Sequence, residues 1–180
     1  VDMYAKCGMF TKAKKLLQDL PIRNTICWNA LIAGYAKQGL GREALTCFEQ
    51  MQREGFSPDT ITFVCIVKAC ANIGDIEKGE EIHAEIDKQG FLLKNIVVGT
   101  SVVDMYARCG MLAKAREVLH SLPERNVVSW TALIGGYAQQ GKYNDAFDSM
   151  DQMRNKGLSP DKVTFICILK ACGKMGNLDK

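Results

Sequence analysis

The sequence contains little proline, little histidine and few aromatic residues. Its 180 residues include four prolines, two histidines and 8% aromatic residues, so long stretches are free to form helices. No run of about 18 uncharged apolar residues occurs, and we therefore expect no membrane-spanning helix and no membrane partner. Hydrophobic residues make up 47% and charged residues 24% of the chain, which excludes wholesale disorder. The net charge of +3 permits a polyanionic partner without requiring one.

Clustered metal ligands are also missing. None of the eight cysteines forms a Cys-x-x-Cys pair, and the only histidines are His83 and His120. Because a tetrahedral zinc site needs a tight group of such side chains, the sequence predicts neither a metal site nor a cofactor. Most of the cysteines fall within apolar helical patterns, so we interpret them as small buried hydrophobic residues in a reducing compartment.

Both ends of the sequence interrupt a pattern. The first residues, 1–8, contain no initiator methionine and no apolar targeting segment, and the chain stops at Lys180 in the middle of a helical pattern. We therefore expect a fragment, with any targeting segment or appended catalytic domain outside it.

The chain repeats itself at a distance of 102 residues. When the sequence is shifted by this distance without a gap, 40 of the 78 overlapped positions carry the same residue. Residues 1–5 then fall on 103–107, and Trp28 falls on Trp130. A period this long contains several smaller units, which is typical of repeat architectures.

Glycines divide each 102-residue block into pairs of helices. Helical stretches end at Gly39, Gly74, Gly110, Gly141 and Gly176, where glycine supplies the left-handed residue that terminates a helix. A second helical stretch follows each glycine, and it ends at Gly55, Gly90 or Gly157, or at Pro21 or Pro123. Such helix-turn-helix units bury their apolar faces by stacking, so we predict an all-α, right-handed α-solenoid formed as one continuous repeat array. The expected units are 1–24 (partial), 25–59, 60–95, 96–126, 127–161 and 162–180 (partial).

The first helix of unit 25–59 has two different faces. At about 100° per residue, Trp28, Leu31, Ile32 and Tyr35 share one apolar face, which we assign to the core. The opposite face carries a β-branched residue, a small polar residue three positions later and usually a long cation or amide eight positions beyond that. The recurring sets are Ile26, Asn29 and Lys37, then Val97, Thr100 and Arg108, then Val128, Thr131 and Gln139. The second helix carries an apolar stripe that packs on its partner, formed by Ala44, Leu45, Phe48 and Met51.

A row of small hydrogen-bonding side chains flanked by apolar residues suits the bases of a single nucleic-acid strand. Bases can be held between apolar side chains and read along their Watson–Crick edges. The recurrent cations are candidates for contacts with backbone phosphates, or else they only solubilise the surface. They are Lys6, Lys37, Arg108 and Lys174.

Several segments resemble the pentatricopeptide repeat (PPR) family, in the plant PLS subclass that alternates standard, long and short motifs. Standard motifs are represented by residues 28–35 (WNALIAGY) and 130–137 (WTALIGGY). Residues 62–70 with 79–83 resemble a long motif, and residues 103–110 with 123–126 resemble a short one. The unit lengths of 35, 36 and 31 residues together give the 102-residue period, and the resemblance covers the whole chain.

The resemblance implies single-stranded RNA binding in plant mitochondria or chloroplasts, with the protein running parallel to the RNA and one base read per motif. In this family the base is set by the polar residue early in the first helix together with the last residue of the motif. Asn29 with Asp59 is similar to a pair that favours uracil and then cytosine, Thr100 with Asn126 to an adenine pair, and Thr131 with Asp161 to a guanine pair. The implied core target is 5′-(U/C)-N-A-G-3′. The implied base-sandwiching residues are Ile26, Val97 and Val128.

The long motif 60–95 departs from this scheme. Val64 occupies its early-helix position and cannot hydrogen-bond a base edge, whereas its final residue, Asn95, can. The base at this motif therefore stays open. With the apolar Ile61 beside it, Val64 could instead bind a partner protein such as another organellar editing factor.

Enzymatic functions have little support in the sequence. Relatives of this subclass often end in, or recruit, a deaminase-like domain for C-to-U RNA editing, which needs His-x-Glu and a distant Pro-Cys-x-x-Cys. His83-Ala84-Glu85 matches the first half, but no Pro-Cys-x-x-Cys occurs. His120 has no nucleophile beside it in the pattern, so we expect no catalysis from this segment. The resemblance implies the targeting part of an RNA-processing factor.

A protein-binding solenoid is the alternative function. Tetratricopeptide repeats also stack helix pairs, with 34 residues per unit. The alternating unit lengths and the polar residues paired with a terminal Asp or Asn favour RNA binding instead. Both functions remain open for the long motif.

The two possibilities for the long motif make opposite predictions for Val64→Asp. If this residue contacts a partner protein, a charge in the apolar patch weakens the partner complex more than RNA binding. Co-purification of the partner and fluorescence anisotropy with RNA, measured in parallel, check this. A variant that loses RNA affinity but keeps its partner would contradict the partner-binding hypothesis.

Overall fold

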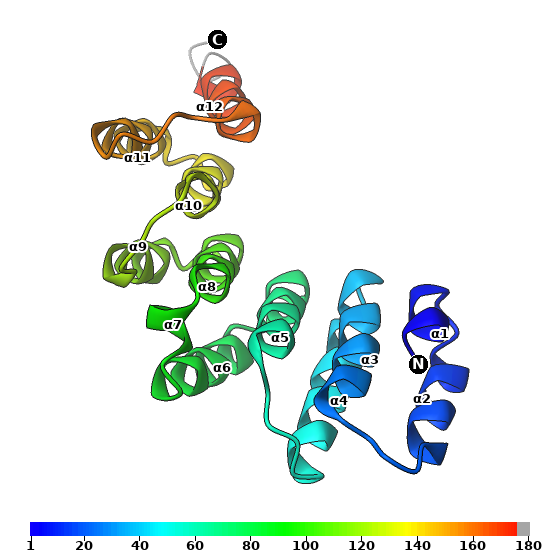
Figure 1. The fold of residues 1–180 in the computed structure, drawn as a ribbon. Coiled ribbons are helices and arrows are strands. Elements are labelled where there is room, and N and C mark those ends of the chain that lie inside the picture. The colour runs from blue at the N-terminus through cyan, green and yellow to red at the C-terminus, as the bar shows by residue number, and fades with distance from the viewer. Residues whose placement is uncertain (176–180) are drawn as a thin grey trace. The chain divides into compact units, whose positions relative to one another are not determined.

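A computed structural model describes the backbone of residues 1–175 and the side chains of residues 1–173. Within this part of the chain all regular elements are helices (Figure 1), which confirms the prediction of an all-α fold built from helix-turn-helix repeats. No described helix is long and apolar enough to cross a membrane.

The helices group into two compact units, Val1–Lys88 and a second that begins at Gln89. The boundary falls inside the predicted motif 60–95. The first unit contains α1 (Asp2–Lys6), α2 (Phe10–Asp19), α3 (Thr25–Lys37), α4 (Gly41–Arg53), α5 (Thr60–Ile73) and α6 (Ile76–Lys88). The second contains α7 (Phe91–Lys94), α8 (Ile96–Arg108), α9 (Leu112–Ser121), α10 (Val127–Gln139), α11 (Tyr143–Asn155) and α12 (Lys162–Met175).

Each unit stacks helix pairs in the same way. In the first unit α1, α3 and α5 pack side by side, and each of them contacts the helix that follows it in the chain. In the second unit α8, α10 and α12 form the equivalent row, and α9 and α11 pack against it as a second layer (Figure 1). A repeat therefore buries its first helix only with the help of its neighbours.

The predicted glycine helix ends are present. Gly74 terminates α5 with φ of +71°, and Gly39 follows α3 with φ of +76°. A residue with a Cβ atom is strained in this region, whereas glycine is not. The glycines that end the other predicted helices also have positive φ, namely Gly55, Gly90, Gly110, Gly141 and Gly157. The predicted end at Gly176 lies outside the described residues.

The core contains the aromatic and aliphatic residues assigned to it from the helical pattern. Trp28 and Trp130 are each 1% exposed. Tyr35 is half-buried and stacks on Phe10 with ring centroids 4.2 Å apart. The other predicted core residues of this repeat are buried as well, namely Leu31, Ile32, Ala44, Leu45, Phe48 and Met51.

The cysteines are less uniformly buried than expected. Cys47 and Cys70 are buried, but Cys7 and Cys172 are exposed and the other four are half-buried. Cys7 follows the end of α1, where the chain turns. Cys172 lies on α12, and within the described residues no following helix covers it. The prediction of burial is therefore wrong for these two positions.

Two adjacent glycines of α10 lie in different surroundings. A Cβ atom at Gly136 would lie 2.8 Å from Leu112 Cδ2 and 2.9 Å from Ala107 Cβ. A Cβ atom at Gly135 would meet only Cys167 Sγ, at 3.4 Å. The 102-residue shift places Ala33 opposite Gly135 but Gly34 opposite Gly136.

We expect Gly136→Ala to destabilise the protein by about 1–3 kcal/mol, because α8 and α9 cannot move away without repacking. The control Gly135→Ala should be neutral or stabilise the protein by up to about 1 kcal/mol through helix propensity. Urea unfolding followed by circular dichroism measures both. Equal effects of the two substitutions would contradict the close approach at Gly136.

Candidate functional site

The structure brings Asn29 and Asp59 into direct contact. Asn29 Nδ2, on α3, donates to both carboxylate oxygens of Asp59 at 2.9 Å. A third side chain completes this group, because Thr62 Oγ1 lies 2.5 Å from Asn29 Oδ1 and 3.0 Å from Asp59 Oδ1. Thr62 is fully buried at the start of α5. The predicted pair is thus part of a three-residue network that links one repeat to the next.

The pair Thr131 and Asp161 is connected through a third residue. Thr131 Oγ1 lies 2.6 Å from Thr164 Oγ1, and Thr164 Oγ1 donates to Asp161 Oδ1 at 2.8 Å. Thr164 occupies the position in α12 that Thr62 occupies in α5, and it is also fully buried. The same hydroxyl therefore bridges the pair in both standard motifs.

The pair Thr100 and Asn126 has no such bridge. Among the described residues Thr100 Oγ1 has no hydrogen-bond partner, although the atom is buried. Ser129, the counterpart of Thr62 and Thr164, instead donates to the backbone oxygen of Asn126 at 2.9 Å. A buried hydroxyl without a partner costs about 1–3 kcal/mol, which a bonding ligand would recover.

The early-helix polar residues are more buried than predicted. Asn29, Thr131 and Thr100 are 5%, 8% and 9% exposed, although the helical pattern placed Asn29 on an uncovered face. The reason is that they lie where consecutive first helices meet, and Asn29 and Thr131 also form hydrogen bonds across that junction. The flanking apolar residues are exposed as expected, with Ile26 at 74% and Val128 at 59%. Val97 is exposed too.

The long motif lacks a comparable pair. Val64 is half-buried on α5, and beside it Ile61 is exposed. Asn95 belongs to the second unit, where its Oδ1 accepts from the backbone N–H of Val97 at 3.0 Å and caps α8.

Capping is a second role of every motif-final residue, and the sequence analysis missed it. Asp59 Oδ1 accepts from the backbone N–H of Thr62 at 2.9 Å, and Thr62 Oγ1 accepts from the backbone N–H of Asp59. Asn126 and Asp161 form the same reciprocal caps with Ser129 and Thr164, whereas Asn24 only accepts, from the backbone N–H of Cys27. An Asp or Asn three positions before a Thr or Ser, ahead of an apolar run, is the signal that indicates such a cap.

Hydrogen bonds keep both aspartates ionised. Burial by itself raises the pKa of Asp59, but hydrogen bonds from the Thr62 backbone and from the Asn29 and Thr62 side chains outweigh it and hold that pKa below its ordinary value. The backbone and hydroxyl of Thr164 likewise lower the pKa of Asp161. At neutral pH both carboxylates therefore only accept hydrogen bonds.

Two of the candidate phosphate-contacting cations already have acidic partners. Lys6 Nζ lies 2.6 Å from Asp2, and Arg108 lies 3.9 Å from Asp104, one helical turn earlier in each case. Lys37 is exposed, and no ion pair involves it within the described residues. The side chain of Lys174 lies outside the described residues.

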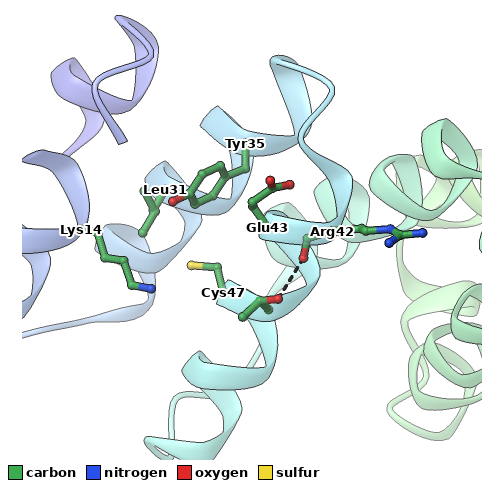
Figure 2. A pocket seen from close by; sticks show the side chains of 7 residues that line it. Lys14, Leu31, Tyr35, Arg42, Glu43 and Cys47 are labelled. Atoms are coloured by element: carbon green, nitrogen blue, oxygen red, sulfur yellow. Dashed lines mark hydrogen bonds between the residues drawn. The ribbon is translucent and has the colours of Figure 1, made fainter. Parts of the chain in front are cut away.

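A pocket of about 250 Å³ lies between α2, α3 and α4 in the first unit. Figure 2 shows Lys14 and Cys47 at this pocket, with the Tyr35 ring and Glu43 on its other side. Burial raises the pKa of Cys47 to about 12, so its thiol stays protonated and is a poor nucleophile.

The other residues considered for catalysis take part in hydrogen bonding and packing within the repeats. Glu85 of the His83-Ala84-Glu85 segment accepts a hydrogen bond from Gln52 Nε2 of α4 at 2.9 Å. His120 packs edge-on against Trp130, with ring centroids 6.1 Å apart. Among the residues searched, no group of three or more His, Cys, Asp or Glu side chains could hold a metal ion.

Stacked helix pairs, with hydrogen-bonded polar side chains at the junctions that follow the two standard motifs, define a helical-repeat protein whose first helices form a row. Two profiles, described as PPR repeat family and PPR repeat, identify the family. The first matches residues 23–72 and 125–174, and the second matches residues 1–24, 61–91 and 100–127. The chain therefore belongs to the pentatricopeptide repeat family.

Curated relatives agree with this assignment. A chloroplastic pentatricopeptide repeat-containing protein of Arabidopsis thaliana is 40% identical over 183 residues, which cover 99% of this chain and 24% of that protein. A mitochondrial one from the same plant is 38% identical over 180 residues, which cover 100% of this chain and 29% of that protein. The chain thus spans about a quarter to a third of the length of these relatives.

Solved structures share the fold. The maize protein PPR10 is matched in a crystal structure in complex with an 18-nucleotide psaJ RNA element, with a TM-score of 0.78 and 22% identity over 91% of this chain and 25% of that one. The PPR domain of Arabidopsis thaliana protein-only RNase P 1, in complex with tRNA, gives a TM-score of 0.69 and 16% identity over 96% of this chain and 94% of that one.

The burial of Cys47 predicts selective thiol reactivity. In the folded protein at about pH 8, Cys7 and Cys172 should react quickly with an aromatic disulfide reagent, whereas Cys47 should react at least about tenfold more slowly, because its thiolate is scarce and shielded. Peptide mapping by mass spectrometry at timed intervals identifies each site. The unfolded chain in guanidinium is the control, in which all of these thiols should react alike. Fast labelling of native Cys47 would contradict the assignment of a protonated, buried thiol.

Proposed function

We propose that this chain binds single-stranded RNA and reads one base per repeat, with a core target of about 5′-(U/C)-N-A-G-3′. The observation that carries the proposal is the side-chain contact between Asn29 and Asp59 across the repeat junction, beside the exposed Ile26. Polar groups at such a junction can meet a base edge while the flanking apolar side chain packs on its face.

The proposal includes a base for each complete pair. Asn29 with Asp59 reads uracil or cytosine, Thr100 with Asn126 reads adenine, and Thr131 with Asp161 reads guanine. Val97 and Val128 pack against the bases of the last two pairs. The base at the long motif, between Val64 and Asn95, is unassigned. This scheme follows the alternating PLS arrangement, with the motif boundaries given above.

The RNA complexes of PPR10 and of the RNase P 1 PPR domain support RNA as the partner. The names of the relatives, chloroplastic or mitochondrial, support an organellar location. We therefore propose that the chain is the targeting part of an organellar RNA-processing factor, with C-to-U editing as the process.

A protein-binding role remains a second candidate for the long motif. The exposed Ile61, 57% accessible, and the half-buried Val64 beside it form an apolar surface on α5 that hydrogen-bonding to a base cannot explain.

The affinity of four repeats is too small for a simple binding assay. Stacking contributes about 1–3 kcal/mol per base, whereas association costs about 4–15 kcal/mol. Specific binding therefore requires more repeats, and the base preference is best measured after residues 25–161 are grafted into a longer array of known preference.

We expect the grafted array to prefer U-N-A-G over the same RNA with A and G exchanged by more than about 1 kcal/mol, the scale of one good base contact. Fluorescence anisotropy at fixed salt measures this difference. The matched variant Asp161→Asn keeps the helix cap, since Asn caps as well as Asp, and should change the last preferred base from G to A. Equal affinities for both RNAs would refute base reading and favour a protein-binding or spacer role.

A further inference from the structure

Each bridging hydroxyl has a single hydrogen and so donates to one partner. Thr164 Oγ1 lies 2.8 Å from the ionised carboxylate of Asp161, a stronger acceptor than the neutral hydroxyl of Thr131. With the Thr164 hydrogen on Asp161, Thr131 Oγ1, 2.6 Å from Thr164 Oγ1, donates its own hydrogen to Thr164. Thr131 and Asp161 are therefore both left with only lone pairs to offer.

A group that only accepts hydrogen bonds matches one purine better than the other. The Watson–Crick edge of guanine carries two donors side by side, N1–H and the N2 amino group, whereas adenine pairs one donor with the acceptor N1. Thr131 and Asp161 together can accept from both guanine donors. They have no hydrogen left to give to adenine N1.

The short motif shows the opposite arrangement. Thr100 Oγ1 is buried and has no partner among the described residues, so its hydrogen is not committed to another group of the chain. Asn126 receives the Ser129 backbone N–H on its Oδ1, and none of the hydrogen bonds recorded within residues 1–173 uses its Nδ2 as a donor. A pair that can both donate and accept matches the mixed edge of adenine.

We propose that the hydroxyl at the third residue of a motif determines whether the base-reading pair before it can donate a hydrogen bond to the base. Thr164 and Thr62 are then positioning residues for base selectivity. This inference rests on the proposed function. Thr164 accepts the hydrogen of Thr131, whereas Ser129 donates to the backbone oxygen of Asn126 and makes no hydrogen bond to Thr100. The two threonine-containing pairs therefore differ in their hydrogen-bond polarity as well as in their final Asp or Asn.

Thr62 faces an amide as well as a carboxylate. Its Oγ1 lies 2.5 Å from Asn29 Oδ1 and 3.0 Å from Asp59 Oδ1, and its single hydrogen can serve one of these acceptors at a time, while Asn29 Nδ2 donates to the Asp59 carboxylate. The amide is thereby held in one orientation.

The test replaces Thr164 with Val, which keeps the side-chain shape and removes the hydroxyl. The variants are compared in the longer array, with the graft extended to residues 25–173 so that it includes Thr164. Fluorescence anisotropy at fixed salt measures the dissociation constants, with RNA probes whose grafted site reads U-U-A-G or U-U-A-A. The array with the wild-type residues should prefer the final G by about fivefold, as for one good base contact. In Thr164→Val this preference should fall below about twofold, and binding of U-U-A-A should strengthen because Thr131 can now donate.

Two further variants separate positioning from helix capping. Ser129→Ala removes a capping hydroxyl that makes no bond to Thr100. It should therefore keep the wild-type preference for G at the last base. It should also keep the preference for A over G at the third base, measured with U-U-A-G against U-U-G-G. Thr164→Ser keeps the hydroxyl and should retain the wild-type ratio. Thermal unfolding of all variants verifies that each is folded.

The outcomes distinguish this inference from the proposed function. If the array with the wild-type residues prefers G and Thr164→Val weakens both RNAs with an unchanged ratio, the hydroxyl only caps α12 and the inference is wrong while base reading stands. If the array with the wild-type residues binds both RNAs equally, base reading itself fails and the inference fails with it.

Discussion

The hydrogen bond between the last side chain of one repeat and the first turn of the next underlies the rest of the structure. Asp59 starts α5, Asn95 starts α8 and Asn126 starts α10 by accepting backbone N–H groups that the helix cannot satisfy itself. Each cap fixes the point at which a helix begins. Since that helix packs between its neighbours, the cap also fixes the register in which the repeats stack.

The same side chain cannot move freely, and this constrains recognition. Asp59 is held by the backbone N–H and the hydroxyl of Thr62 and by the Asn29 amide. A base that contacts such a carboxylate meets a group whose position and charge exist before binding, so little free energy is needed to organise it. Thr100 differs, because its buried hydroxyl is unsatisfied in the free protein. Under the proposed function, a base that bonds to this hydroxyl would relieve that cost.

Much of the architecture could be predicted from residue pattern alone. The 102-residue repeat is visible in the sequence and predicts stacked units. Helical periodicity places Trp28 in the core, and the left-handed conformation that glycine adopts predicts where helices end. The burial of Asn29 could not be predicted, because periodicity within one helix does not show which neighbouring helix covers a face. The Lys6–Asp2 ion pair, in contrast, follows from an i, i+4 spacing that the sequence already shows. The bridging role of Thr164 depends on contacts between repeats.

The ion pairs of Lys6 and Arg108 bear on how an RNA-binding surface of this kind would discriminate. A cation that already has a carboxylate beside it gains less from a phosphate and releases fewer counterions when a strand binds. Attraction to any polyanion is then weak. Under the proposed function, the ratio between correct and incorrect transcripts would depend mainly on base edges, and it would change little when the ionic strength of the compartment changes.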